Sequence, residues 1–169
     1  MNDTSLHRAS APNFIRQLNH LNAWFDKAEA HAKAKKFDVE VLLQARLAPD
    51  MFTLIGQVQL ATAFAKNALC RLAGQEPPDF PAAEKTLADL RARIARTLAI
   101  VQAISPDQLQ GAATRQVTVR TGPDTSMTMT GEDYLFNFSL PQFYFHVTMT
   151  YALLRHNGVD LGKRDFVGS

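Results

Sequence analysis

The sequence has a single cysteine and no long apolar run. One thiol, Cys70, cannot form an internal disulfide, and its apolar neighbours Leu69 and Leu72 predict a buried, unreactive side chain. A membrane-spanning helix needs about 20 mostly apolar residues, and no stretch here reaches that length, so no membrane partner is expected. Residues 1–11 lack the apolar stretch of a secretory signal. These absences predict a cytoplasmic protein.

The net charge is also low. Charged residues make up 20% of the chain and the net charge is +2, with basic side chains interleaved among acidic ones. Nucleic-acid binding usually needs a clustered basic face, so no nucleic-acid partner is expected. The 46% of hydrophobic residues is typical of a globular protein. With no repeat or linker visible, we expect one helical-bundle domain over residues 1–169.

Familiar catalytic and metal-binding motifs are missing as well. The five histidines are His7, His20, His31, His146 and His156. No two of them have the spacing of an HxxxH or HExxH motif, and the sequence has no CxxC, GxSxG, P-loop or GxGxxG. The residues alone therefore predict no metal site and no cofactor.

Hydrophobic periodicity predicts helices in the first half of the chain. Apolar residues at three- and four-residue steps predict a helix over residues 12–36, followed by a short helical turn at 39–44. Pro49 suits the first turn of a second helix. That helix is expected to run to Leu72 and to stop at Gly74, since glycine commonly ends helices.

A third helix is predicted over residues 82–104, after a stiff proline-rich loop at 76–81. Its apolar side chains fall on one face. Three arginines, at positions 91, 93 and 96, lie mostly outside that face, so we expect them on the solvated surface.

The period then changes to two. Val117 and Val119 alternate with polar residues, as do Met127 and Met129, and a Gly-Pro-Asp turn separates the two runs. This pattern predicts a short β-hairpin before the last helix.

The last helix is predicted over residues 134–156, with Thr130 and Asp133 as a cap. Pro141 is expected to kink it, and the tail at 161–166 is expected to pack back on the bundle. Aromatic residues cover most of the helix surface. Because such a helix is either central or shared with a partner, we predict a homodimer.

Two polar side chains stand among these aromatics. Gln142 and His146 are four residues apart and so share a helix face. Gln57 and Gln59 interrupt the apolar second helix in the same way. Buried polar groups need partners, so these residues form either a hydrogen-bonded core cluster or the polar floor of a small-molecule pocket.

Several segments resemble an uncharacterised bacterial family, a domain of unknown function that is similar to the DinB/YfiT-like superfamily. They are residues 45–52, 145–148, 156–158 and 162–166. The resemblance covers nearly the whole chain and implies an all-α, four-helix bundle, often dimeric.

Many members of that superfamily bind a divalent metal through three histidines, one on the second helix and an HxxxH pair on the last. The resemblance implies that His146 matches the second histidine of the pair, with Gln142 in the place of the first. The second helix has no histidine and offers Gln57 or Gln59. Two of the three ligands are absent.

Three functions remain open. In the first, the chain is a metal-free protein that binds a small molecule at the altered metal position, through Gln57, Gln142 and His146. Alternatively it is a metal- or thiol-dependent transferase-type enzyme with His146 as general base. As a third possibility, it is a purely structural homodimer.

Overall fold

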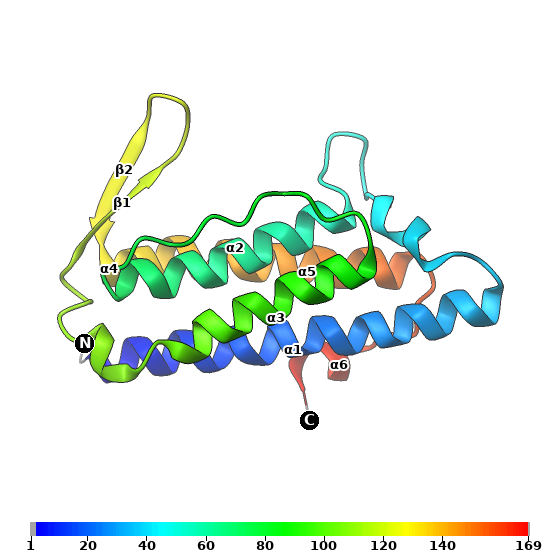
Figure 1. The fold of residues 1–169 in the computed structure, drawn as a ribbon, viewed down its shortest axis with the longest axis horizontal. Coiled ribbons are helices and arrows are strands. Elements are labelled where there is room, and N and C mark those ends of the chain that lie inside the picture. The colour runs from blue at the N-terminus through cyan, green and yellow to red at the C-terminus, as the bar shows by residue number, and fades with distance from the viewer. Residues whose placement is uncertain (1–2, 169) are drawn as a thin grey trace.

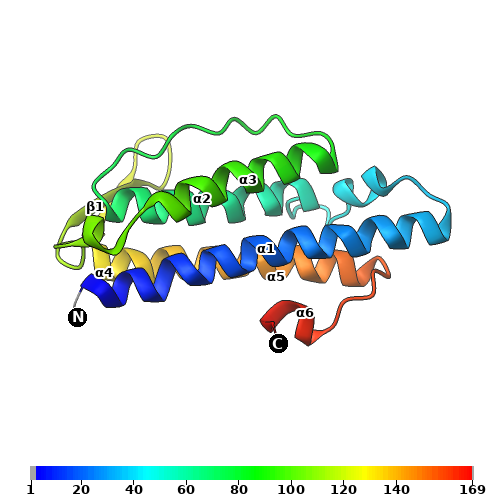
Figure 2. The ribbon, with the colours of Figure 1, turned by 60° about the horizontal axis from the view of Figure 1, so that its bottom comes forward.

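The computed structural model of the chain describes residues 3–168. Within them, four long helices run side by side and form a bundle (Figures 1 and 2). They are α1 (Asp3–Lys35), α2 (Leu54–Leu72), α3 (Leu87–Ala103) and α5 (Leu140–His156). The expected helical-bundle fold with a β-hairpin before the last helix is confirmed.

Shorter elements connect and flank these helices. They are η1 (Val39–Gln44), η2 (Pro106–Leu109), β1 (Gln116–Arg120), β2 (Ser126–Thr130), α4 (Gly131–Asp133), the π-helical η3 (Tyr134–Ser139) and α6 (Lys163–Val167). The connection between α2 and α3 has no regular structure and runs back along the bundle (Figure 1). We call its residues 75–86 the strap.

The helices enclose a core of large apolar side chains. Phe14 of α1 meets Phe143 of α5 edge to face, with ring centroids 4.7 Å apart. Trp24 is also fully buried. Cys70 lies in the interior, as its apolar neighbours predicted. No helix among the described residues is long and apolar enough to cross a membrane.

The first helix begins earlier than its sequence suggested. Pro12 lies inside α1, which already starts at Asp3. A proline inside a helix removes one hydrogen bond, from its own position to the carbonyl four residues earlier. Both Pro12 and Arg8 are exposed, so water can solvate that carbonyl. Leu6 is fully buried and extends the apolar stripe of α1 past the proline.

The second helix begins later than predicted. Pro49 lies in a turn in which the amide of Met51 donates to the carbonyl of Ala48 (3.0 Å). The cap of α2 is Thr53, whose hydroxyl accepts from the amide of Gly56. A side-chain acceptor satisfies a free amide of the first turn, which proline at position 49 could not do.

The third helix also begins later, at Leu87 rather than residue 82. Thr86 and Asp89 form a capping box: the Thr86 hydroxyl accepts from the amide of Asp89 (3.1 Å), and the Asp89 carboxylate accepts from the amide of Thr86 (3.0 Å). This reciprocal pair sets the helix start. Residues 82–85 therefore belong to the strap.

The hairpin is confirmed at its predicted place. Strands β1 and β2 are antiparallel, with Val117 opposite Met129 and Val119 opposite Met127. Both valines are buried, whereas Met127 is 50% exposed, so only the β1 side packs fully. The ribbon projects from one end of the bundle (Figure 1).

The last helix contains a wide turn that its sequence did not reveal. Residues Tyr134–Ser139 are π-helical, and the amide of Leu140 donates to the carbonyl of Leu135, five residues earlier. The turn ends just before Pro141, which lies in the first turn of α5. The helix continues without a break from η3 into α5, so the missing amide hydrogen of Pro141 removes one backbone hydrogen bond to the π turn before it.

The C-terminal tail packs back on α1, as expected. The indole of Trp24 donates to the carbonyl of Asp165 (3.1 Å) and stacks on Phe166 with ring centroids 5.8 Å apart. Lys27 binds the Asp165 carboxylate at 2.7 Å. The helix α6 is therefore held along one face of α1 (Figure 2).

The hairpin generates a test of its own packing. Val117→Ser should lower the free energy of unfolding by about 1–3 kcal/mol, because a buried methyl pair is replaced by a hydroxyl. Thr118→Ser, at the exposed neighbouring position, is the matched control and should change stability little. Urea denaturation of both variants measures the difference. Equal stability of the two would show that β1 contributes no core contact.

Candidate functional site

The predicted polar cluster lies where α2 crosses α5. The ring nitrogen Nδ1 of His146 is 2.8 Å from Oε1 of Gln57. Gln57 is 1% exposed and His146 is 6% exposed. The structure thus brings together two of the three residues that the sequence singled out.

The orientation of the Gln57 amide determines the protonation of His146. The amide nitrogen of Gln57 donates to the carbonyl of Phe52 (3.3 Å), so its oxygen faces the imidazole. A carboxamide oxygen can only accept, and Nδ1 of His146 must therefore carry the hydrogen. Burial lowers the pKa of His146 from 6.5 to about 4. At neutral pH the ring is uncharged and Nε2 holds a free lone pair.

Aromatic rings surround this pair. Phe64 of α2 stacks on the imidazole, with centroids 5.6 Å apart and planes 11° apart. Phe145 meets the imidazole edge to face at 5.2 Å, and its side chain is 51% exposed. The imidazole therefore contacts the partly buried ring of Phe64 and the half-exposed ring of Phe145.

The two other glutamines occupy different environments. Gln142 is partly exposed and has no side-chain hydrogen bond to any described residue. Gln59 has a different partner, since its amide donates to Glu84 of the strap (2.8 Å). Helix periodicity could not tell Gln57 from Gln59, because the partner that distinguishes them is far away in sequence.

Gln57, Gln142 and His146 together offer one imidazole and no thiolate or carboxylate to a metal ion. His146 has committed Nδ1 to Gln57, and the remaining positions hold neutral carboxamides, which are poor ligands for zinc or nickel. Nowhere in residues 3–168 do three His, Cys, Asp or Glu side chains gather closely enough to hold a metal.

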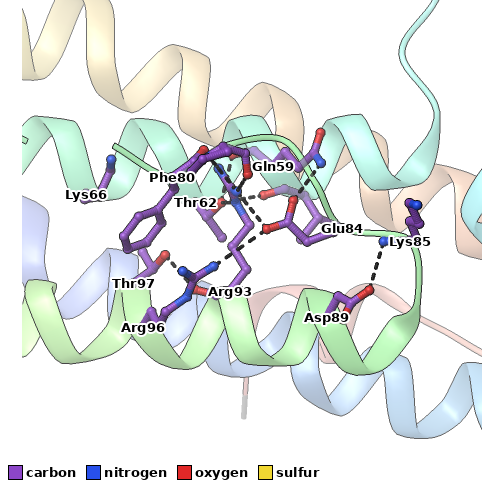
Figure 3. Close-up of polar contacts among 12 residues, drawn as sticks. Gln59, Thr62, Lys66, Phe80, Glu84, Lys85, Asp89, Arg93, Arg96 and Thr97 are labelled. Carbon is purple, nitrogen blue, oxygen red and sulfur yellow. Dashed lines mark hydrogen bonds and ion pairs between the residues drawn. The ribbon is translucent and has the colours of Figure 1, made fainter. Parts of the chain in front are cut away.

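A second polar cluster, which the sequence did not indicate, holds the strap. Arg93 was expected on the surface but is 3% exposed. Its guanidinium donates to the Thr62 hydroxyl (2.8 Å), to the Pro81 carbonyl (3.2 Å) and to the Glu84 carboxylate (2.9 Å) (Figure 3). The prediction for Arg93 was wrong because the strap covers this part of α3. Arg96 is exposed, as predicted.

Glu84 is the anionic partner in this cluster. Burial alone would raise the pKa of Glu84, but hydrogen bonds from Arg93 and Gln59 outweigh it and hold the pKa below its usual value. The ring of Phe80 lies against Arg96 and Lys66, each 4.5 Å from its centroid. The contacts all join the strap to α2 and α3, so we assign this cluster a structural role.

The fold is that of a DinB-like helical bundle. The structure is similar to the crystal structure of a DinB family member protein from Shewanella denitrificans, with a TM-score of 0.92 and 41% sequence identity. The match covers 99% of this chain and 94% of that chain. No curated protein matches the sequence.

The sequence also matches the family described as a domain of unknown function (DUF1993), over residues 6–167. The chain therefore belongs to this DinB-like family.

Burial of His146 predicts a specific pH dependence of stability. Between pH 6.5 and about pH 4 the unfolded chain binds a proton at this residue and the folded chain does not. The contribution of His146 to the free energy of unfolding is therefore greatest above pH 6.5. It falls as the pH drops toward 4, by up to about 3 kcal/mol at 1.36 kcal/mol per pKa unit.

Urea denaturation at a series of pH values measures this dependence. His146→Gln should flatten the slope of stability against pH within that window. His156→Gln, at an exposed position on the same helix, should retain the slope of the unmodified protein. A His146→Gln slope equal to that of the unmodified protein would contradict the assignment of a neutral, buried imidazole.

Proposed function

We propose that this chain is a metal-free, homodimeric member of the DinB-like bundles that binds a small, uncharged polar molecule between α2 and α5. Gln57, Gln142 and His146 are the ligand-binding residues. The observation that carries the proposal is the hydrogen bond from His146 Nδ1 to Gln57 Oε1, at 2.8 Å.

This hydrogen bond supports a neutral ligand for two reasons. It leaves Nε2 of His146 as an acceptor with no partner among the described residues. The Gln142 carboxamide, four residues earlier on the same helix, makes no hydrogen bond there either. Both groups are uncharged at neutral pH, because burial holds the pKa of His146 near 4. A ligand with one donor and one acceptor, such as an amide or an alcohol, complements them.

The enzymatic alternative has less support. A general base works best when its pKa lies near the operating pH. An imidazole with a pKa near 4 is a weak base, and no second titratable residue bonds to it among those described. We therefore favour binding over transferase chemistry.

The proposed homodimer rests on exposed aromatic side chains beside the same site. Phe52 is 61% exposed and Phe145 is 51% exposed. The carbonyl of Phe52 holds Gln57, and Phe145 contacts the His146 ring. Exposed apolar side chains of this size favour a partner surface. A two-fold dimer through this face would cover both rings.

Ligand binding can be followed at the imidazole itself. Acetamide, a neutral probe with a donor and an acceptor, should shift the His146 Nε2 resonance in a saturable way. Gln142→Ala should weaken the effect several-fold, whereas Gln102→Ala, at an exposed position of α3, should not. Methylammonium should leave the resonance unchanged. A linear acetamide response, or equal responses in the two variants, would refute the proposal.

Light scattering tests the dimer separately. We expect a mass of about twice the 18.7 kDa of one chain. The double variant Phe52→Ser, Phe145→Ser should fall to one chain mass, because both exposed rings are lost. Val41→Ser, at a side chain 65% exposed on η1, should remain a dimer. A single-chain mass for the unmodified protein would rule the dimer out.

Elemental analysis tests the metal-free state. Protein purified without chelator should contain no stoichiometric zinc or nickel, since one imidazole and two carboxamides are too few ligands of the right type. A content near one equivalent per chain, lost in His146→Ala, would overturn this expectation.

A further inference from the structure

A second candidate binding site lies at the opposite end of α2 from Thr53. A surface hollow of about 350 Å³ separates the C-terminal end of α2, the first residues of the strap and strand β1. Two arginines line it: Arg71, which belongs to α2, and Arg115, which directly precedes β1. Both are partly buried. The hollow is distinct from the α2–α5 site and independent of the function proposed for it.

Both guanidinium groups are held in place by the fold. Arg71 donates to the hydroxyl of Tyr134 (3.2 Å), a side chain that is 1% exposed. Arg115 donates to the carbonyl of Leu72 at the end of α2. Fixed guanidinium groups lose little freedom on binding, so an anion is bound at a lower entropic cost.

A glycine ends α2 beside the Arg115 guanidinium. Gly74 has φ +72°, a conformation that favours glycine, and a Cβ there would lie 3.4 Å from the central carbon of the Arg115 guanidinium. Glycine is favoured there by its positive φ, which turns the chain at the end of α2, where Arg115 bonds to the Leu72 carbonyl.

Most donors in the hollow remain unused. A guanidinium has five N–H groups, and Arg71 and Arg115 each make one hydrogen bond to a described residue. Gln75 and Gln116 also line the hollow, and their side chains make no hydrogen bond within residues 3–168. Glu76 is the one acidic residue in the lining, and it is exposed. The hollow carries two positive charges against one negative charge.

We propose that this hollow binds the oxyanion of a small molecule, a carboxylate or a phosphate, between Arg71 and Arg115. Paired N–H groups of guanidinium match the spacing of oxygens in both anions. The carboxamides of Gln75 and Gln116 supply donors for the remaining oxygens. The volume exceeds that of the anion alone, so the ligand carries the group on a small polar body.

Side-chain NMR of the arginine Nε–H groups gives a site-specific test. Inorganic phosphate and acetate are titrated separately into the intact protein at constant ionic strength, with chloride as reference. Phosphate raises the stability of many proteins without binding, so the readout is the Arg71 and Arg115 signals rather than the melting temperature. Saturation at millimolar concentration by either anion supports the site. The anion that saturates first identifies the preferred group.

Variants distinguish a specific anion-binding site from non-specific electrostatic attraction. Arg115→Lys keeps the charge but loses the paired donors, and should weaken binding about tenfold. Arg120→Lys, on the exposed outer part of β1, is the matched control and should bind normally. Glu76→Gln removes the opposing charge and should strengthen binding about threefold. A folding defect cannot produce that gain.

Failure of both anions to saturate the two signals would overturn the proposal. So would equal weakening by Arg115→Lys and Arg120→Lys, or a Glu76→Gln variant that binds no more tightly than the unmodified protein.

Discussion

The position of the strap depends above all on the buried guanidinium of Arg93, with Lys66 as a second buried cation that donates to the Pro78 carbonyl. The Arg93 guanidinium joins three parts of the chain, because it extends from α3, donates to Thr62 of α2 and binds Glu84 together with carbonyls of the strap. A buried charge that loses its partner is costly, about 3–5 kcal/mol. The side chains of Arg93 and Glu84 are only 4% and 6% exposed. The irregular strap is therefore fixed by paired charges and not by secondary structure.

The sequence predicted the helices well but their starting points poorly. Apolar periodicity reports the buried face of a helix, and it located α1, α2, α3 and the last helix correctly. Helix starts depend instead on single caps. Thr53 and Thr86 form these caps with partners three residues further along the chain, whereas Pro49 was wrongly taken as the start of α2. The burial of Arg93 could not be predicted from the helix pattern. Arg93 lies on the polar face of α3, and the strap, which is outside the helix, covers that face.

The candidate site was only partly accessible from the sequence. His146 and Gln57 were both identified as polar residues among apolar ones, yet no spacing rule relates side chains on different helices. Their hydrogen bond depends on the register of α2 against α5. Gln142 was grouped with His146 by its four-residue spacing, and the structure leaves its amide without that partner. No pattern in the sequence indicated the hollow between Arg71 and Arg115, since it forms only when the end of α2 meets the start of β1.

The π-helical segment η3 has a consequence for the phase of the last helix. A π turn accommodates one residue more than an α turn, and one residue rotates everything after it by about 100° around the helix axis. The residues of α5 that face α2, His146 among them, therefore owe their direction to the wide turn at Tyr134–Ser139. Loss of a single residue from that turn would give a more regular helix and point the imidazole away from Gln57. In this fold, the length of a six-residue segment determines which side chains form the site.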